Sequence, residues 1–406
     1  MTRSLVYLSG APRVSTRSDA VASGPRSHIL GVIHAFESVG WKVERYIVGD
    51  RLPKKWISGE DIEIGLRSNI FIRLTADVAR LLFGIYHSWK AANSIKQCDW
   101  AYERFGAFQA MGWQFQKRGI PWILETNELY YINADKDRQT TSFVSLMKRW
   151  ETWAYRQCDV LVCVSRSLAE LIIREIGIPR EKVLVIPNGV DTARFNLELH
   201  KPKRVFQHPT IGFVGHLSPW QRLDLLIEAL AGLRGEGVDF KLVVIGDGPM
   251  RSQWEALVER LGQIEQVRFL GRVPWDDVPA YISGFDLGYT GPVPLASGEM
   301  YLSPLKLYEY AAMGRPIVAA AYADAQRLME DGVAVYLFEP GNQEDLCRAL
   351  RQAYAERDLW VQKGMRSRAI IVERHSWEAR VRELISCVES ILEAKYGTPY
   401  PARRHS

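Results

Sequence analysis

The sequence contains few cysteines, and their spacing gives them no evident structural role. No two of them have C-x-x-C spacing, which favours neither a disulfide framework nor a structural zinc site. We therefore expect reduced thiols in the protein core. The five cysteines among the 406 residues are Cys98, Cys158, Cys163, Cys347 and Cys387.

Long apolar runs and compact basic runs are also missing. The first residues, MTRSLVYLSGAPR, hold too few apolar side chains before a polar stretch for a secretory signal or a membrane span. This predicts a cytoplasmic location. The sequence contains no low-complexity segment, short-period repeat or nucleic-acid-binding motif, so a nucleic acid is not an expected partner.

The chain does have enough apolar side chains for two cores. Apolar residues make up 47% and charged residues 24% of it, and the net charge is +5. This composition is typical of a globular protein with two domains. Residues 1–205 carry 30 Lys and Arg against 21 Asp and Glu, whereas residues 206–406 carry 22 against 26. The basic front half suggests an acidic partner, either a phosphorylated acceptor or an anionic membrane touched peripherally.

Short apolar runs alternate with helical patterns in both halves. Runs that are apolar on both faces predict parallel strands covered by helices, which is the doubly wound α/β architecture made twice. The predicted strands are SLVYLS, WAYERF, PWILET, VLVCVS and VLVIP, followed by TIGFVG, KLVVIG, VRFLG, LGYT and PIVAA.

Two Rossmann-like domains follow from this alternation. We expect one domain at 1–204, a second domain at 205–374 and a terminal helix at 375–396 that crosses back to the first domain. The polar, proline-bounded segment 199–209 is the expected linker. Because ligands bind beyond the carboxyl ends of such strands, a site in an interdomain cleft is predicted.

The stretch SPLKLYEYAAMGRPIVAA, residues 303–320, indicates an anion site. Pro304 after Ser303 predicts a helix start with free backbone amides, and Gly314 predicts its end. Lys306 and Glu309 lie on the first turns of this helix. The alternative is an exposed ion pair at i,i+3.

Two glycine turns in the same half strengthen that interpretation. Gly215 follows the strand TIGFV, and Gly246 with Asp247 follows KLVVI, each before a predicted helix. Glycine permits close backbone approach to a ligand, and a helix start carries partial positive charge. Together the three signals suggest a diphosphate site, although each turn alone could be structural.

Taken together, these motifs resemble those of a known family, the retaining glycosyltransferases of family 4 with the GT-B fold. The resemblance runs from about Asp99 to Trp377, and its specificity lies in six motifs occurring in order. The motifs are VLVCVS, KVLVIPNGVDTARF, TIGFVGHLSPWQRLDLLIEAL, LVVIGDGP, VRFLGRVPWDDVPAYISGFDLGY and SPLKLYEYAAMGRPIVA.

The resemblance implies roles for the 303–309 segment. Glu309 would bind the ribose hydroxyls of a nucleotide sugar, and Lys306 would neutralise its diphosphate. The backbone amides of Ser303, Pro304 and Leu305 would lie near the donor, although the proline has no N–H to offer. The donor is expected to be UDP- or GDP-linked and to serve as a substrate, with no further cofactor. The acceptor would be a glycan, a lipid-linked molecule or a small molecule.

Several positions depart from the family pattern. Many members have an arginine after the FVG glycine and a lysine-glycine pair five residues further on, where this chain has His216, Gln221 and Arg222. Tyr301 stands where the family has the first glutamate of its E-x7-E pair. A tyrosine can donate a hydrogen bond to a sugar but is no carboxylate. These departures put the donor sugar in doubt.

The resemblance implies that the front domain, 1–204, binds the acceptor and that the second domain, 205–374, binds the nucleotide-sugar donor. The strand PWILET ends at Glu125 and is followed by Asn127, where relatives have a residue close to the reacting sugar; the alternative is an asparagine that caps a helix. Further candidates are strand-end or helix-start positions, of which His28 and Ser165 have helix-packing or capping alternatives. These candidates are Ser9, Gly10, Gly24, His28 and Ser165.

A helical apolar stripe runs from Leu74 to Trp89, with basic residues beside it. The expected explanation is a helix packed on the sheet, and the sharper alternative is a helix that contacts anionic lipid. No Asp-x-Asp motif stands at a strand end, and Asp276-Asp277 is interpreted as a helix start. The sequence therefore predicts metal-independent transfer.

Two other functions stay open at this stage. A nucleotide-sugar epimerase of the same architecture is disfavoured by the transferase-like motifs. A catalytically silent subunit is suggested by His216, Gln221 and Tyr301, which occupy positions that are usually charged.

Overall fold

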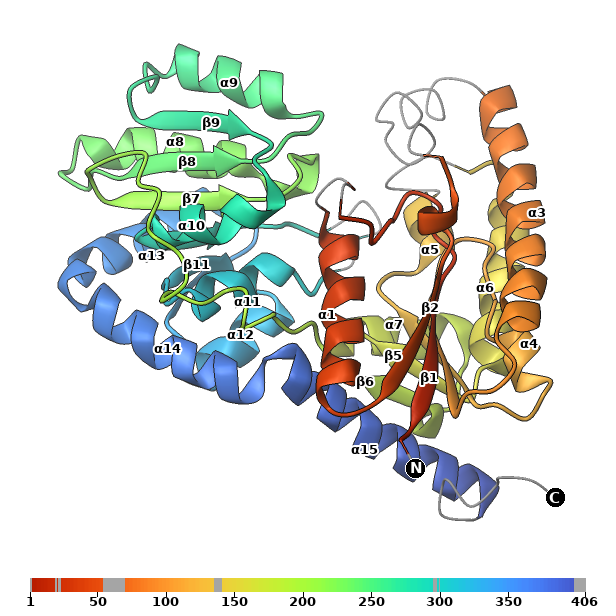
Figure 1. Ribbon diagram of the computed structural model, residues 1–406. Coiled ribbons are helices and arrows are strands. Elements are labelled where there is room, and N and C mark those ends of the chain that lie inside the picture. Colours follow the sequence, from red (N-terminus) through yellow and green to blue (C-terminus); the bar gives the residue numbers. More distant parts are fainter. Residues whose placement is uncertain are drawn as a thin grey trace. The chain divides into compact units, whose positions relative to one another are not determined.

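The computed structural model describes residues 2–18, 20, 23–53, 70–134, 141–294, 298 and 300–397. The described residues form two compact units, each built on its own sheet (Figure 1). Unit 1 takes in residues 1–187, 301–303 and 380 onward, and unit 2 takes in 188–300 and 304–379.

The division between the units falls after Pro187, ahead of the expected linker. The segment 199–209 belongs to unit 2, because its backbone and side chains pair there. The Lys203 N–H donates to the Ala280 carbonyl over 2.9 Å, and Arg204 pairs with Asp286 over 3.0 Å.

Unit 1 contains a six-stranded sheet whose paired strands are all parallel. The chain adds strands on one side of β1 and then on the other, so the strand order reverses between β1 and β3. Ligands of doubly wound sheets bind at such a switch point. The strands in spatial order are β2 (Lys42–Ile47), β1 (Ser4–Ser9), β3 (Trp100–Arg104), β4 (Trp122–Thr126), β5 (Val160–Cys163) and β6 (Val183–Val185).

The helices of unit 1 begin where the sequence supplies caps. The Ser23 side chain accepts from the Arg26 N–H at the start of α1, and the Ser165 side chain accepts from the Leu168 N–H at the start of α7. The described helices are α1 (Gly24–Ser38), α3 (Ile70–Ser94), α4 (Trp113–Gln116), α5 (Tyr130–Ile132), α6 (Val144–Gln157) and α7 (Arg166–Ile176), with short 3-10 turns η1 (Gly49–Arg51) and η4 (Arg180–Lys182).

The terminal helix α15 (Trp377–Tyr396) is divided between the units at Arg380. Its later residues bind unit 1 through two anchors. Arg3 pairs with Glu389, and Asp159 accepts from both Lys395 and Tyr396 over 2.6 Å.

Unit 2 repeats the architecture with a second six-stranded sheet of parallel strands. Its strand order reverses between β10 and β7, which places the switch point beside the end of β7. The strands in spatial order are β12 (Val335–Phe338), β11 (Ile317–Ala320), β10 (Leu287–Thr290), β7 (Thr210–Val214), β8 (Lys241–Ile245) and β9 (Val267–Gly271).

The helices of unit 2 follow the strands in the expected alternation. The predicted helix after Pro304 is α11, which ends before Gly314, a glycine with φ +62°. The helices are α8 (Leu223–Arg234), α9 (Arg251–Arg260), α10 (Val278–Ser283), α11 (Leu305–Ala312), α12 (Ala323–Glu330), α13 (Gln343–Ala355) and α14 (Trp360–Arg374), with 3-10 turns η5 (Pro219–Gln221), η6 (Trp275–Asp277) and η7 (Arg357–Leu359).

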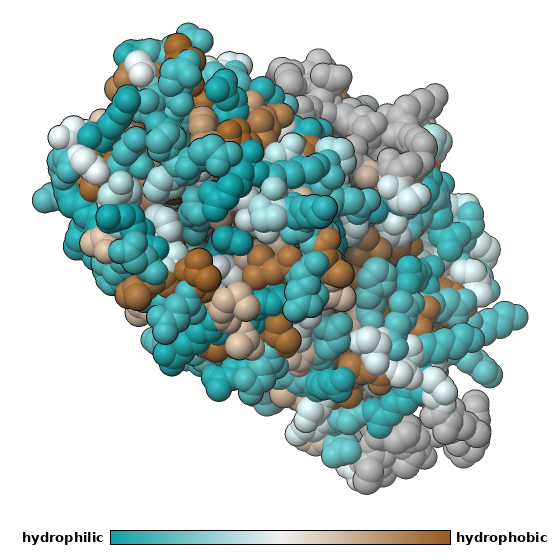
Figure 2. Space-filling model, turned by 60° about the vertical axis from the view of Figure 1, so that its left-hand side comes forward, coloured by the Kyte–Doolittle hydropathy of each residue, from teal (hydrophilic) through white to brown (hydrophobic). Residues whose placement is uncertain are grey.

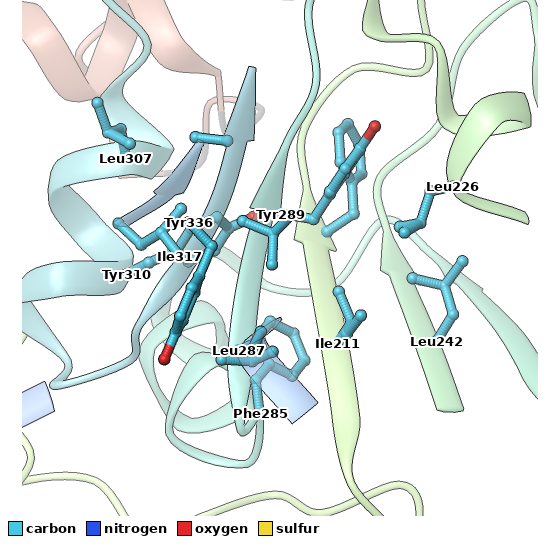
Figure 3. Packing of buried hydrophobic residues seen from close by; sticks show 14 of the residues in the cluster. Ile211, Leu226, Leu242, Phe285, Leu287, Tyr289, Leu307, Tyr310, Ile317 and Tyr336 are labelled. Atoms are coloured by element: carbon cyan, nitrogen blue, oxygen red, sulfur yellow. The ribbon is translucent and has the colours of Figure 1, made fainter. Parts of the chain in front are cut away.

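The helix α11 is held tightly on the sheet of unit 2. Leu307 and Tyr310 are fully buried in its core (Figure 3). The Tyr310 ring occupies the space that a Cβ at Gly288 would need, with only 2.2 Å between them. The Tyr310 hydroxyl also accepts the Val214 N–H over 2.8 Å. This packing fixes α11 beside the end of β7.

The structure confirms the doubly wound architecture of both halves and the ten strands predicted from sequence. It adds β2 and β12, which are edge strands. The sequence of β2, KVERYI, is polar and largely exposed at its start, unlike the doubly covered central strands. Hydrophilic residues cover most of the face shown in Figure 2, where hydrophobic residues appear as separate patches.

Candidate functional site

The loops after β7 and β8 pack backbone against backbone at the switch point of unit 2. Gly246 has φ +126°, and a Cβ there would lie 1.9 Å from the Gly215 carbonyl oxygen. The Gly215 N–H in turn donates to Ile245 over 3.0 Å. Gly246 is therefore required by the close approach between the two loops.

Lys306 reaches from the first turn of α11 to the end of β7. Its Nζ lies 3.1 Å from the Gln221 Oε1 and 3.8 Å from the centroid of the Phe213 ring. A Cβ at Gly215 would be 3.0 Å from the same nitrogen. The residue is only 9% exposed. The alternative of an exposed surface ion pair with Glu309 is therefore wrong.

Burial lowers the pKa of Lys306 toward neutral pH. Loss of solvation lowers its pKa to about 7, and the nearby Glu309 charge offsets only part of this. None of the ion pairs among the described residues joins Lys306 to a carboxylate, and a buried ammonium of this kind favours an anion as its partner.

Glu309 lies one turn further along α11 and is partly buried. Burial raises its pKa to about 7, while the charges of Arg194 and then Lys306 oppose that rise. Arg194 lies over the Trp275 ring at 3.0 Å from its centroid and donates to the Trp275 carbonyl. Its influence on this site was missed by the sequence analysis, because 115 residues separate it from Glu309.

Other predicted donor residues have structural partners or lie exposed. Arg222 has φ +45° and pairs with Asp224 over 3.0 Å, and His216 is exposed. Asp247 accepts the Gly248 N–H over 2.9 Å and pairs with Arg251. Of the cations predicted for this site, Lys306 is the one that the structure buries at the switch point.

The loop before α11 shows where the remaining donor candidates lie. Pro304 precedes α11 and Leu305 is its first residue, and among the described residues no side chain caps the helix start. Tyr301 and Ser303 are 1% and 8% exposed and group with unit 1. The Tyr301 carbonyl accepts the Ser165 hydroxyl over 2.8 Å.

Glu125 is the centre of a buried network at the carboxyl edge of the unit 1 sheet. Its carboxylate lies 2.6 Å from the His28 Nε2 and 3.8 Å from the Arg104 Nε. It also accepts from the Tyr102 hydroxyl over 2.6 Å and from the Asn127 Nδ2 over 3.0 Å.

The network holds Glu125 ionised. Burial alone would raise its pKa, but the charge and hydrogen bond of His28, together with Arg104 and Tyr102, outweigh burial and lower the pKa to about 2. The sequence analysis predicted His28, Glu125 and Asn127 but missed Tyr102 and Arg104. The only sequence signal for them was their position near the end of the predicted strand WAYERF.

The other acceptor candidates lie at strand ends or helix starts of unit 1. Ser9 ends β1 opposite Arg104 in the strand register, and Gly10 follows, where a Cβ would come within 2.5 Å of the Gln109 side chain. Gly24 opens α1. Ser165 caps α7, which confirms its structural alternative. The capping alternative for Asn127 is wrong, since its amide donates to Glu125 and Leu129 precedes α5.

The apolar stripe of α3 is not packed on the sheet as expected. Val78, Leu82, Ile85 and Trp89 are 45%, 60%, 53% and 64% exposed. The described part of the chain contains no helix long and apolar enough to cross a membrane. Within that same part, no three His, Cys, Asp or Glu side chains are grouped to hold a metal ion.

Comparison with known proteins gives two family matches. The model described as Glycosyltransferase Family 4 matches residues 28–194, and the model described as Glycosyl transferases group 1 matches residues 208–356.

Named relatives agree with these matches. The chain is 30% identical over 285 residues to 2-deoxystreptamine glucosyltransferase of Streptomyces kanamyceticus, an alignment that covers 64% of this chain and 72% of that protein. It is 26% identical over 243 residues to the amylovoran biosynthesis glycosyltransferase AmsK of Erwinia amylovora, where the alignment covers 58% of each chain. The match thus spans less than two thirds of the amylovoran protein.

Solved structures share the fold at low identity. Sucrose-phosphate synthase from Thermosynechococcus elongatus superposes with a TM-score of 0.71 at 15% identity, covering 97% of this chain and all of that one. HepE of Anabaena, solved in complex with UDP-glucose, gives a TM-score of 0.64 at 16% identity and covers 98% of this chain and 100% of that one.

Proposed function

The chain belongs to the family 4 glycosyltransferases with the GT-B fold, and we propose that it transfers a sugar from a UDP- or GDP-linked donor to a glycan, lipid-linked or small-molecule acceptor. By their names, one relative above is a glucosyltransferase for 2-deoxystreptamine and the other is a glycosyltransferase of amylovoran biosynthesis. A role in cell-surface polysaccharide or glycoconjugate synthesis is the context we favour.

The position of Lys306 is the observation that carries the donor proposal. Its buried Nζ lies at the switch point of unit 2, beside Gly215 and the start of α11. A donor diphosphate placed there would meet this ammonium and the free amides of a helix start. HepE, a protein of the same fold, was solved with UDP-glucose, which agrees with a nucleotide sugar as ligand.

Glu309 is proposed to accept hydrogen bonds from the ribose hydroxyls. It lies one helical turn beyond Lys306, so one short helix presents a cation and a carboxylate at i and i+3. The rigid packing of α11 would keep both groups in place while the donor binds.

Charge that develops on the leaving diphosphate would be stabilised by Lys306. As the glycosidic bond breaks, negative charge grows on the phosphate, and a fixed cation in a buried site lowers the barrier. We propose that the acceptor attacks on the face that the diphosphate leaves, with the diphosphate assisting removal of the acceptor proton. The anomeric configuration would then be retained, without a metal ion.

The acceptor is proposed to bind at the carboxyl edge of the unit 1 sheet. Asn127 donates to Glu125 through its side-chain amide, which leaves its carbonyl oxygen for a sugar hydroxyl. His28 and Glu125 are buried in the network, so we assign them to positioning Asn127. A cytoplasmic location remains a prediction from sequence.

A screen of nucleotide sugars tests the proposal directly. The purified protein is incubated with a panel of UDP- and GDP-sugars, and mass spectrometry follows hydrolysis or transfer. We expect one donor to turn over, with the product anomer retained by NMR and the rate unchanged by EDTA. Glu309→Ala should abolish turnover while the melting temperature stays close to that of the wild type.

The outcomes separate the alternatives. Calorimetric binding of a donor without any turnover would favour a catalytically silent subunit. Conversion of the donor sugar to its epimer without an acceptor would favour an epimerase. Full activity of Glu309→Ala would overturn the site assignment.

A further inference from the structure

The helix α3 is built with its apolar stripe facing outward. Phe71, Val78, Leu82, Ile85 and Trp89 recur at helical spacing, and each is between 45% and 75% exposed. At 1.5 Å per residue, the stripe from the first to the last of these is about 27 Å long. Contiguous exposed apolar surface of this kind marks an interaction site.

Polar and small residues hold the opposite side of α3 against unit 1. Asp77 is fully buried, and its Oδ2 accepts from the Thr141 hydroxyl over 2.9 Å and from the Ser142 N–H over 2.7 Å. The Tyr46 hydroxyl lies 3.0 Å from the His87 Nδ1. These bonds fix the rotation of α3 about its axis, so the outward stripe is a property of the folded unit.

Close backbone packing reinforces this orientation. A Cβ at Gly84 would lie 2.3 Å from the Phe108 carbonyl oxygen, so α3 touches the loop after β3 at this residue. Ala91 and Ala92 are also buried, at 0% and 2% exposed. Gly84, Ala91 and Ala92 thus face inward while Leu82, Ile85 and Trp89 face outward, the reverse of an ordinary helix on a globular protein.

Within the described segment 70–118, which contains α3, the exposed charges are all positive. Between residues 70 and 118 the acidic residues are Asp77, Asp99 and Glu103, and all three are buried. The exposed charged residues of the same segment are Lys90, Lys96, Lys117 and Arg118.

Two of these basic residues lie against aromatic rings close to α3. The Lys90 Nζ lies 3.2 Å from the Tyr86 hydroxyl, and the Lys117 Nζ lies over the Trp113 ring at 3.4 Å from its centroid. The helix α4, which contains Trp113, contacts α3. Aromatic rings beside lysines, above an apolar stripe, are typical of the membrane interface.

We propose that the outward face of α3 docks the protein on an anionic lipid bilayer. The stripe would enter the boundary between headgroups and acyl chains, and the lysines beside it would pair with lipid phosphates. The helix would lie in the plane of the surface, because no described helix is apolar enough to span the bilayer. This inference concerns a surface outside both candidate substrate sites and does not rest on the transfer reaction.

The charge pattern favours lipid over a second copy of the chain. A self-association interface built on α3 would bring the same lysines together from both copies, and like charges at an interface are repulsive. Interfaces between proteins are also depleted in lysine. An anionic surface instead gains from every lysine on this face.

Vesicle co-sedimentation of the full chain tests the proposal. We expect binding to vesicles of phosphatidylcholine with phosphatidylglycerol, and little binding to phosphatidylcholine alone or at high salt. Leu82→Gln with Trp89→Gln should lower the partition coefficient at least tenfold, because both exposed side chains lose their apolar contact. Lys90→Gln and Lys96→Gln should each lower it about fivefold.

Matched controls keep the test specific. Val361→Gln with Met365→Gln replaces two apolar residues that are 77% and 52% exposed on α14, and this variant should bind like the wild type. Hydroxyl-radical labelling should show that anionic vesicles protect Trp89. Equal binding of Leu82→Gln/Trp89→Gln and wild type would overturn the proposal. A wild-type dimer that this variant dissociates, with no vesicle binding, would assign the face to a second copy instead.

Discussion

At the carboxyl edge of the unit 1 sheet the surroundings favour the charged form of a buried group, whereas at the carboxyl edge of the unit 2 sheet they favour the neutral forms. In unit 1, Glu125 is surrounded by a histidine, an arginine, a tyrosine and an asparagine, and its pKa falls to about 2. In unit 2, the described residues provide Lys306 and Glu309 with no such set of partners, and burial brings both pKa values to about 7.

The difference lies in the partners that stabilise each charge. A carboxylate whose ionisation is stabilised by its neighbours contributes to the folded state. Burial disfavours the protonated form of a lysine, and an anionic ligand beside it would stabilise that form. We therefore assign Glu125 a positioning role and Lys306 a ligand-binding role.

The largest expected effect is the loss of stability in Glu125→Ala. Removing one partner from a buried charge network leaves the others unpaired and costs about 3–5 kcal/mol. Urea unfolding should show this as a lower midpoint. Removal of Glu170, whose ion pair with Arg180 is solvent-exposed, is the control and should leave the midpoint nearly unchanged.

The same network predicts an acid-sensitive stability. Because the folded pKa of Glu125 is about 2 and the ordinary value is about 4.3, its contribution is complete above the ordinary value and disappears as the pH falls toward 2. Glu125→Gln should flatten this part of the stability profile. A midpoint that is unaffected by Glu125→Ala would contradict the network assignment.

Next in size is the effect of Lys306→Ala on turnover. Loss of one stabilising contact to developing charge should lower kcat about 10²–10³-fold. The melting temperature should not fall, because a buried ammonium is removed. Lys241→Ala is the matched control, since Lys241 is 8% exposed but lies at the start of β8, away from the carboxyl edge. Equal losses in both variants would show that lysine removal acts through the fold.

Donor affinity should also depend on pH. Lys306 is protonated below its pKa of about 7, so its contribution to donor affinity should be constant there and fall by up to about tenfold per unit as the pH rises further. Lys306→Arg should bind without that fall, because a guanidinium keeps its proton. Calorimetric titration with the donor between pH 6 and about 9 measures the donor affinity of the wild type and of Lys306→Arg. The same slope in the arginine variant would assign the titration to another group, such as Glu309.

The smallest expected effect is that of Arg222→Gly. A non-glycine residue at φ +45° costs about 1–2 kcal/mol, whereas its partly exposed ion pair with Asp224 contributes at most about 1 kcal/mol. Glycine should therefore raise the free energy of unfolding slightly. Arg222→Ala keeps the backbone strain and loses the pair, so it should be less stable than Arg222→Gly. A lower stability of Arg222→Gly than of Arg222→Ala would contradict the backbone strain at position 222.

The strands were predictable where both faces are covered. Central strands such as β4 and β5 are apolar at nearly every position, and this pattern is visible without a structure. The edge strand β2 was missed because its sequence KVERYI is not a continuous apolar run, and its first four residues are partly or fully exposed.

The local elements of the site were predictable from the sequence, but the contacts between distant residues were not. The helix start at Pro304 and the glycine turns at Gly215 and Gly246 were visible as local signals. The influence of Arg194 on Glu309 and the role of Tyr102 in the Glu125 network join residues far apart in the chain. Local patterns carry no information on such pairings.

The sequence alone determined the two doubly wound sheets, the helix at 305–312 and the family, because periodicity, turn glycines and motif order are local properties of the chain. Only the tertiary structure decided which side of α3 faces outward, since periodicity locates a stripe and not the surface it meets. It likewise decided that Lys306 is buried with a lowered pKa and that Glu125 is compensated, because solvation and pairing depend on neighbours that folding brings from distant segments.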